Sequence, residues 1–332
     1  MQTDEAPAGI DAGKRRWQTN DIASKKGNNM SSWSLITYRM ESAGREAEVA
    51  AIRRADGRVV VPDALRPYPG LVHALNDWDA LAPLLRDIDP DALEPLEGQE
   101  LLSIRHPRKV LCVGANYRDH IAEMGVTEIP DGWQPYFFLV PPTTALVGDG
   151  DAVLIPADPA FAVDWEAELA VVIGRGGRDI RPEDALDHVA GYACFNDITA
   201  RGLLRRKVAI APPFQFDWTA CKGLDGFSPL GAVKPAWQVG DPNDLRIRCL
   251  VNGVVKQDGS TASLITSIPE IIAAASRYFT LEPGDVIATG TPAGVGHTRG
   301  ERLVDGDEVR VEITGLAPLR NTVRERQVQA AR

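Results

Sequence analysis

Short patterns of alternating or continuous apolar residues dominate the second half of the chain. Leu245–Val251 alternates polar and apolar side chains, which is the period of a strand with one buried face. Asn252-Gly253 follows it, and this dipeptide favours a two-residue hairpin turn because both residues tolerate a positive φ. Upstream, Leu169–Ile173 is apolar without a break, as is typical of a strand buried on both faces. These patterns predict a strand-rich domain.

Other runs rich in β-branched and aromatic residues also predict strands. They lie at residues 109–113, 135–140, 285–288 and 308–313. Helices are predicted at residues 181–186 and 268–275, because each run opens with proline and acidic residues. No Gly-x-Gly-x-x-Gly motif follows a strand, which argues against a doubly wound nucleotide-binding fold. The expected fold class is α+β and strand-dominated, a mixed β-roll or distorted β-barrel with a few helices.

Three segments are expected along the chain. Residues 1–30 are polar and aperiodic, so we expect a disordered N-terminal extension. Residues 31–106 predict a small α+β domain, with strands and short helices at residues 34–38, 58–61, 70–75 and 81–85. Residues 107–326 are the predicted catalytic domain, because the strand-rich pattern and the candidate chemistry both lie there.

The composition is that of an ordinary globular protein, with 44% hydrophobic and 25% charged positions in 332 residues. Its 36 basic and 46 acidic residues give a net charge of −10, which argues against nucleic acid or an anionic membrane as a partner. No run approaches the roughly eighteen apolar residues of a membrane span, and the N-terminus lacks the apolar core of a secretory signal. The 4 cysteines lie far apart, which predicts reduced thiols in a cytoplasmic protein.

Three carboxylates form a candidate metal site. Glu166 and Glu168 open the apolar run, and alternate residues of a strand point to the same side, so both can face one ion. Asp197 follows in the turn that begins at Asn196. Two unpaired carboxylates at the start of a buried strand are costly unless a cation meets them. Oxygen ligands of this kind favour Mg²⁺, Mn²⁺ or Ca²⁺ over zinc.

His120 and Glu123 form a candidate general base. They lie three residues apart, which on one helical turn brings their side chains within reach of each other. The carboxylate would fix the imidazole tautomer and favour the imidazolium formed when water gives up its proton. The alternative is an incidental pair on a surface helix.

Four motifs, Val113–Met124, Asp164–Gly174, Gly191–Arg201 and Thr289–Gly296, occur in this order. In their order and spacing they resemble the fumarylacetoacetate hydrolase family, over about residues 108–325. The resemblance implies a mixed β-roll catalytic domain that forms a homodimer. It also implies bound Mg²⁺ or Mn²⁺ and a small-molecule 1,3-dicarbonyl or 2-oxo acid substrate.

Nine residues of this chain fall on the functional positions of that family. The implied metal ligands are Glu166, Glu168 and Asp197; the catalytic residues are His120, Glu123 and Lys222; the substrate contacts are Tyr117, Arg201 and Thr291. The implied roles are water activation by the His–Glu pair and stabilisation of an oxyanion, or anchoring of a carboxylate, by the lysine. The ion would stabilise the enolate that departs when the carbon–carbon bond breaks.

The expected function is therefore a metal-dependent hydrolase that cleaves a C–C bond of an acylpyruvate-like or other 1,3-dicarbonyl or 2-oxo acid compound. The closest alternative is a decarboxylase or isomerase of a 2-oxo-ene-dioate from aromatic catabolism, which needs the same metal and enolate. A non-catalytic scaffold stabilised by its metal is a third reading. A phosphoryl-transfer enzyme is a fourth, disfavoured because no Gly-x-x-x-x-Gly-Lys-Ser/Thr loop is present.

The chain departs from the family pattern around the substrate. An acid and a glutamine are common at the positions of Gly202 and Leu204, and residues 207–218 form an insertion rich in proline and aromatic residues. Two polar contacts are therefore missing. We expect a larger or less polar acyl pocket, bordered by Trp133, Phe214, Phe216 and Trp218.

Overall fold

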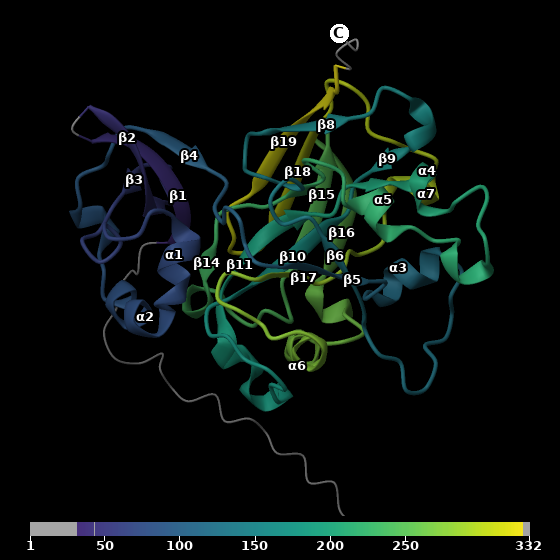
Figure 1. Cartoon of the computed structure of the whole chain (residues 1–332), viewed down its shortest axis with the longest axis horizontal. Coiled ribbons are helices and arrows are strands. Elements are labelled where there is room, and N and C mark those ends of the chain that lie inside the picture. Colours follow the sequence, from purple (N-terminus) through teal and green to yellow (C-terminus); the bar gives the residue numbers. More distant parts are fainter. Residues whose placement is uncertain (1–31, 43, 328–332) are drawn as a thin grey trace, which may run out of the picture. The chain divides into compact units, whose positions relative to one another are not determined.

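A six-stranded sheet lies at the centre of the predicted catalytic domain (Figure 1). The computed structural model describes residues 32–42 and 44–327. The strands lie in the order β14-β11-β10-β17-β5-β6, and neighbours are antiparallel except for β17 and β5. Their bounds are β5 Val110–Gly114, β6 Tyr136–Val140, β10 Ala167–Ile173, β11 Val189–Asn196, β14 Lys234–Pro235 and β17 Val286–Ala288. The disordered extension expected at residues 1–30 lies outside the described residues.

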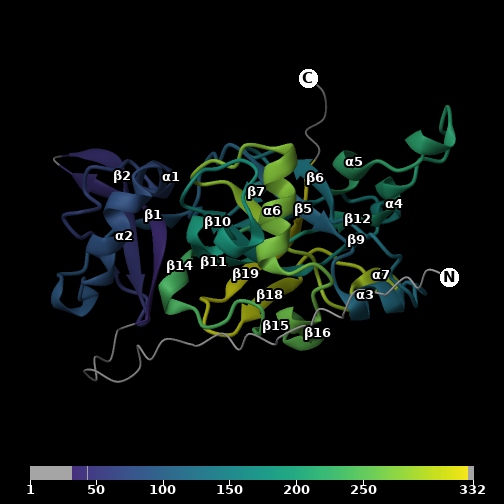
Figure 2. The same ribbon diagram turned by 90° about the horizontal axis from the view of Figure 1, so that it is seen from below.

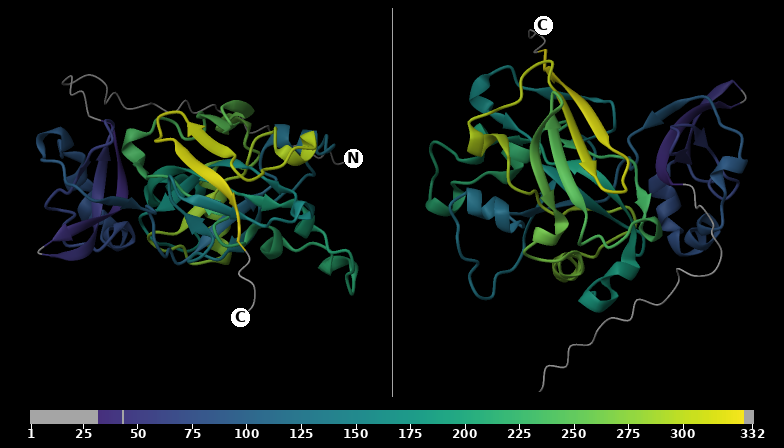
Figure 3. Two further views of the ribbon diagram at one scale, coloured as in Figure 1. Left: turned by 90° about the horizontal axis from the view of Figure 1, so that it is seen from above. Right: turned by 180° about the vertical axis from the view of Figure 1, so that it is seen from behind.

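A five-stranded sheet packs against one face of the six-stranded sheet, and Figure 3 shows it from behind. Its order is β16-β15-β18-β19-β8, with bounds β8 Ala152–Ile155, β15 Arg246–Val251, β16 Val254–Ser260, β18 Glu308–Ile313 and β19 Leu319–Glu325. The predicted hairpin at Asn252-Gly253 is confirmed, because both residues have positive φ and join the antiparallel strands β15 and β16. Two further pairs are β9 (Val163–Asp164) with β12 (Thr199–Ala200), and β7 (Leu146–Val147) with β13 (Ser228–Pro229).

Strand β10 is buried on both faces, as its continuous apolar sequence predicts. Leu169, Val171 and Ile173 pack in the core shared with the five-stranded sheet and helix α6 (Ile268–Tyr278). Ala170 and Val172 point to the other face and pack in a second core with residues of the N-terminal segment, here residues 32–106. Glu166 and Glu168 continue the two-residue spacing of Ala170 and Val172. Their side chains therefore point to the same face of the sheet as these two residues.

The N-terminal segment forms a four-stranded sheet with two short helices. The strand order is β3-β2-β1-β4, with bounds β1 Trp33–Ser42, β2 Arg45–Arg54, β3 Val59–Val60 and β4 Gln99–Leu101. Helices α1 (Leu71–Asn76) and α2 (Trp78–Arg86) match the two predicted helical pieces, whereas β2 and β4 are not among the predicted strands. Leu35 forms a bridge with Val233, next to β14. The boundary at residues 106 and 107 stays a prediction, since Ser31–Arg332 is one compact unit.

Helices are few and short in the rest of the described chain. Helix α6 is the longest of them, begins with a capping box between Ser267 and Glu270, and is seen along its length in Figure 2. The run predicted as a helix at residues 181–186 is a 3-10 helix, Pro182–His188. The remaining α-helices are α3 Arg118–Glu123, α4 Arg201–Leu204, α5 Trp218–Lys222 and α7 Gly296–Arg299. The strand-dominated α+β class is therefore confirmed.

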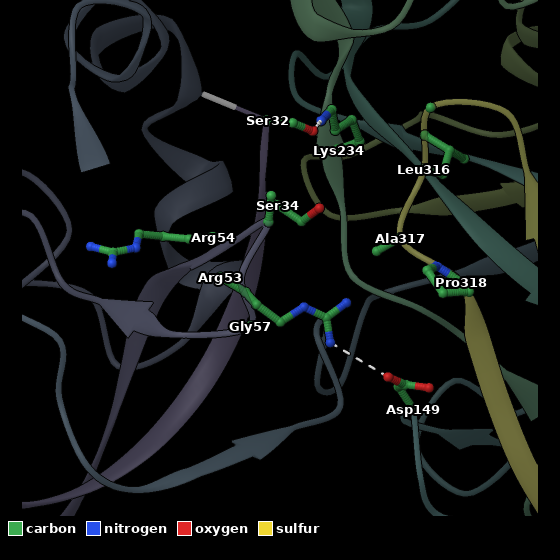
Figure 4. A pocket seen from close by; sticks show the side chains of 12 residues that line it. Ser32, Ser34, Arg53, Arg54, Gly57, Asp149, Lys234, Leu316, Ala317 and Pro318 are labelled. Carbon is green, nitrogen blue, oxygen red and sulfur yellow. Dashed lines mark hydrogen bonds and ion pairs between the residues drawn. The ribbon is translucent and has the colours of Figure 1, made fainter. Parts of the chain in front are cut away.

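A cavity of about 380 Å³ lies between the ends of β1 and β2 and the residues around β14 (Figure 4). Arg53 reaches across it and donates to Asp149 at 3.4 Å. Lys234 lines the same cavity and is 4% exposed, and its ammonium donates to the hydroxyl of Ser32. Burial disfavours the charged form and lowers the pKa of Lys234, and no carboxylate of the described residues pairs with its ammonium.

Within residues 32–42 and 44–327, no helix has the length and hydrophobicity that crossing a membrane requires. Cys112, Cys194, Cys221 and Cys249 are all buried as free thiols, as their spacing predicts.

Candidate metal centre and active site

The pairing of β10 with β11 brings three carboxylates together: Glu166, Glu168 and Asp197, hereafter the acidic triad. Ala167 is the partner of Asn196 in the antiparallel register, so the residues just outside this pair meet at the strand ends. The Asp197 amide donates to the Glu166 carbonyl at 2.9 Å. One oxygen of each triad member lies within 4.8 Å of the others, and all three side chains are buried. The tertiary structure thus brings the three predicted metal ligands together.

Two basic side chains bind these acids. The Lys222 ammonium, from the last residue of α5, donates to Glu166 Oε2 at 2.7 Å and also to Asp197. The Arg201 guanidinium, from the start of α4, donates to Glu166 and, at 3.0 Å, to Asp164 Oδ2. With every group ionised, four carboxylates face two basic groups, so two negative charges remain uncompensated.

The three triad carboxylates differ in pKa. Burial raises the pKa of Glu166, but the charges of Lys222 and Arg201 outweigh burial and bring that pKa to about 2. Burial raises the pKa of Asp197 to about 6 in spite of the Lys222 charge. The pKa of Glu168 lies well above its usual range, first because of burial and then because of the charges of Asp197 and Glu166. Glu168 is the acid that most needs a further positive charge in order to ionise.

The acidic triad fits a hard divalent cation. Asp197 Oδ1 is buried and has no hydrogen-bond partner among the described residues. A cation bound there would coordinate this oxygen and stabilise the ionised carboxylate of Glu168. It would also compensate the two negative charges that the basic residues leave. The donors are carboxylate oxygens alone, the ligands that Mg²⁺, Mn²⁺ and Ca²⁺ prefer. The triad could therefore hold a divalent metal ion.

The predicted His–Glu pair is formed on α3. His120 Nδ1 lies 2.7 Å from Glu123 Oε1, and the His120 side chain is buried. The second oxygen of Glu123 accepts from the Gly294 amide and from the Thr298 hydroxyl, both at 3.0 Å. These two donors hold the carboxylate, which in turn orients the imidazole. The charge of His120 also lowers the pKa of Glu166, after the larger effects of burial, Lys222 and Arg201. Gly290, whose amide donates to Glu168 at 2.8 Å, lies against Tyr117 at the start of α3.

The three residues predicted to contact substrate have different surroundings. Tyr117 is fully buried, and its hydroxyl has no hydrogen-bond partner among the described residues. The Thr291 hydroxyl donates to the Ala167 carbonyl and accepts from the Gln257 amide, both at 2.8 Å. Arg201 is paired with acids, as described above. Of the three, only Tyr117 has a buried polar atom without a hydrogen-bond partner in the described chain.

Asp164 belongs to the site but is not among the predicted site residues. Its Oδ1 accepts from the amides of Trp165 and Gly296, at 2.7 and 2.6 Å. Its Oδ2 accepts from the His297 amide at 2.9 Å and from Arg201. Asp164 thereby ties the start of α7 to the arginine that binds Glu166. Its even spacing with Glu166 and Glu168 was the signal that could have identified it.

The structure explains why residue 202 is a glycine. A Cβ added to Gly202 would lie 1.9 Å from the Ala160 carbonyl oxygen, which is far closer than two such atoms can approach. Any larger residue would displace the 3-10 turn Pro159–Phe161 or helix α4. The backbone around residue 202 therefore leaves no room for the acid that is common at this position in the family.

The comparisons with known proteins agree with the geometry. The model of the fumarylacetoacetate (FAA) hydrolase C-terminal domain matches residues 109–324. The mitochondrial oxaloacetate tautomerase of Xenopus laevis is 41% identical over 226 residues, which are 67% of this chain and 67% of that protein.

Two solved structures are also similar. The fumarylacetoacetate hydrolase of Exiguobacterium antarcticum has a TM-score of 0.69 and 35% identity, over 88% of this chain and 100% of that one. The fumarylpyruvate hydrolase of Pseudomonas aeruginosa, solved with Mn²⁺ and pyruvate, has a TM-score of 0.59 and 34% identity, over 69% of this chain and 93% of that one. This chain belongs to the fumarylacetoacetate hydrolase family, a family of enzymes that includes hydrolases and tautomerases.

Proposed function

We propose that this protein is a metal-dependent hydrolase that cleaves the C–C bond of an acylpyruvate-like 1,3-dicarbonyl acid. The observation that carries the proposal is the combination of an oriented histidine, His120 held by Glu123, with a buried acidic triad that fits a divalent cation. Hydrolysis needs both features, a base for water and a positive centre for the charge that leaves. The fumarylpyruvate hydrolase of Pseudomonas aeruginosa was solved with Mn²⁺ and pyruvate, which supports the choice of cation and substrate class.

The residues of this chain have separate roles in the proposal. His120 takes a proton from water, and Glu123 holds the imidazole and stabilises its charged form. Glu166, Glu168 and Asp197 hold Mg²⁺ or Mn²⁺, and the same oxygen ligands also suit Ca²⁺. A bound ion would supply Lewis-acid stabilisation of the negative charge on the substrate oxygens.

The basic and phenolic groups complete the site. The Lys222 ammonium, already directed at the triad, stabilises an oxyanion or anchors the substrate carboxylate. The buried Tyr117 hydroxyl donates to a substrate oxygen, since no described protein acceptor satisfies it. Arg201 orients Glu166 through Nη2, and its Nη1 contacts the substrate. The Thr291 hydroxyl is already hydrogen-bonded to Ala167 and Gln257. The backbone amides next to Thr291 therefore donate to the substrate in its place.

The second candidate function is isomerisation or decarboxylation of a 2-oxo dioate. The 41% identity with an oxaloacetate tautomerase favours this candidate. Moving a proton between the carbon and oxygen of a 2-oxo acid uses the same cation and carboxylate pocket but no attacking water. The two functions therefore share the triad and differ in what they require of His120 and Glu123.

A paired assay separates the candidates. Purified protein with Mn²⁺ is tested for cleavage of acylpyruvates, followed by loss of the enol absorbance, and for oxaloacetate enol–keto exchange. The proposal expects hydrolysis, and it expects His120→Gln to lower hydrolysis by about two to four powers of ten. Rapid tautomerisation without hydrolysis in the wild type, retained in His120→Gln, contradicts the hydrolase and supports the second candidate.

We propose a homodimer in the cytoplasm, with neither nucleic acid nor membrane as a partner, in keeping with the charge of −10. Light scattering of the purified protein, with and without Mn²⁺, tests the dimer. A monomer under both conditions would contradict it.

A further inference from the structure

Three aromatic rings lie together beside Lys222. The Trp218 ring stacks on Phe138, with centroids 5.5 Å apart and an interplanar angle of 22°. It also lies 5.7 Å from the ring of Tyr136. The Lys222 ammonium lies 5.6 Å from the centroid of Phe138. Because this ammonium also binds Glu166, the aromatic cluster of Tyr136, Phe138 and Trp218 adjoins the candidate metal centre.

The Tyr136 ring also reaches the segment that carries the His–Glu pair. In the β5–β6 register Tyr136 is opposite Gly114. A Cβ on Gly114 would lie 2.9 Å from Tyr136 Cδ1, so the ring lies across the end of β5. The chain runs from Gly114 to Tyr117 and then into α3 with His120. The aromatic cluster therefore contacts both of the segments that bring catalytic groups to the site.

The cluster changes from buried to exposed along β6. Phe138 is 9% exposed, whereas Tyr136 is 43% exposed and Trp218 is half-buried. Trp218 is held in place at the start of α5, where the Asp217 side chain accepts from the Ala220 amide at 2.9 Å. An aromatic surface held beside the charged Lys222 and partly open to solvent is suited to binding part of a ligand.

Two basic residues near this surface are paired with acids. Arg206 binds Asp217, and Arg201 binds Asp164 and Glu166. A substrate with a second carboxylate at this end would meet aromatic rings, and the nitrogens of Arg201 and Arg206 that bind acids would first have to leave those partners. The glycine at position 202 removes a further polar contact, as described above.

We propose that Tyr136 and Trp218 bind the acyl group of the substrate, and that this group is apolar or aromatic rather than a second carboxylate. This inference rests on the proposed function and defines its substrate class. It predicts that aryl or long-chain acylpyruvates are better substrates than acetylpyruvate or dioates, because their acyl group removes the ring surfaces from water.

The test compares kcat/KM for benzoylpyruvate, acetylpyruvate and fumarylpyruvate in four proteins: the wild type, Tyr136→Leu, Trp218→Leu and Tyr278→Leu. We expect the wild type to prefer benzoylpyruvate at least about tenfold, since that is the selectivity a hydrophobic pocket gives a larger apolar group. Each cluster variant loses this preference through a higher KM for benzoylpyruvate, with acetylpyruvate little affected. Tyr278→Leu is the matched control, because Tyr278 is 62% exposed and lies on helix α6, outside the cluster.

A second readout does not depend on turnover. N-phenyloxamate should inhibit the wild type more strongly than oxamate does, and the two cluster variants, but not Trp218→Phe, should lose that difference. Equal losses for all substrates and inhibitors, or preference for fumarylpyruvate in the wild type, would overturn the inference and leave the hydrolase intact. Absence of hydrolysis of every acylpyruvate would instead overturn the proposed function itself.

Discussion

The ammonium of Lys222 lies 2.7 Å from Glu166 Oε2 and also binds Asp197, so one lysine occupies two of the three triad carboxylates. Burial alone would lower the pKa of Lys222, but the charges of Asp197 and Glu166 more than offset burial and raise it. The lysine therefore remains charged, and it shares its carboxylates with any cation that binds the triad.

Replacing Lys222 by methionine should separate metal binding from turnover. Without the ammonium the triad holds more negative charge, so we expect Mn²⁺ to bind about tenfold more tightly or better, as a like charge a few ångströms away is removed. Turnover should fall by about two to three powers of ten, because the charge that stabilises an oxyanion is lost. Titration of Mn²⁺ by calorimetry and kcat measurement check the two effects, with Lys222→Arg as the control that keeps the charge. Weaker Mn²⁺ binding in the methionine variant would contradict this competition.

The acidic triad should make thermal stability depend on divalent metal. At a Mn²⁺ concentration about a hundred times its Kd, mass action stabilises the folded state by about 2.7 kcal/mol, so Tm should rise by several degrees and fall again with a chelator. Glu168→Gln should abolish this rise and make the metal-free protein more stable, because it removes the carboxylate that burial and its neighbours disfavour. The exposed Glu308→Gln is the control. The same Mn²⁺-dependent rise in the Glu168 variant would show that the ion binds elsewhere.

Glu123→Gln tests whether Glu123 orients the general base. The amide keeps the volume but lacks the charge that favours the imidazolium, so kcat should fall by about ten- to a hundredfold, as for other partners that orient a functional histidine. The Kd for Mn²⁺ should be unchanged, because Glu123 is not a triad member. A change in the Kd for Mn²⁺ equal to the change in kcat would indicate a structural effect on the triad instead.

Gly202→Ala tests the close approach of α4 to the preceding 3-10 turn. The new Cβ would lie 1.9 Å from the Ala160 carbonyl oxygen, so the backbone must move. We expect a loss of about 1–3 kcal/mol in the free energy of unfolding, as for other overpacked positions. Gly240→Ala is the matched control, since a Cβ there meets no atom within 4 Å. Chemical denaturation of both variants measures the difference, and equal stabilities would contradict the clash.

Lys234→Met should stabilise the protein at neutral pH. Lys234 is 4% exposed beside the cavity in Figure 4, and burial without a carboxylate partner lowers its pKa. The unfolded chain therefore holds this proton more tightly than the folded one, so the wild-type stability rises with pH between the lowered pKa and 10.5, the ordinary value. The methionine variant should gain about 1 kcal/mol at pH 7, since it removes a buried charge, and the gain should shrink toward pH 10. The exposed Lys207→Met is the control, and a loss of stability at pH 7 would indicate that the ammonium has an anionic partner.

The sequence by itself determined the fold class, the family and most of the candidate site. Leu169–Ile173 predicts a strand buried on both faces, and Asn252-Gly253 predicts a hairpin, because both depend on side-chain period and local backbone preference. His120 and Glu123 meet within one helical turn, so their spacing was sufficient. Local signals were weaker in the N-terminal segment, where β2 and β4 are not predicted.

Only the tertiary structure decided how the charges and rings of the site are paired. Asp164 joins the site through Arg201, and Lys222 reaches Glu166 across 56 positions of sequence. Trp218 meets Phe138 because α5 lies against β6. No local period encodes such pairs, since each depends on which distant strands become neighbours in the sheet. The sequence identifies the candidate catalytic and metal-binding side chains. Long-range packing determines which of them are paired with other residues and which have no partner among the described residues.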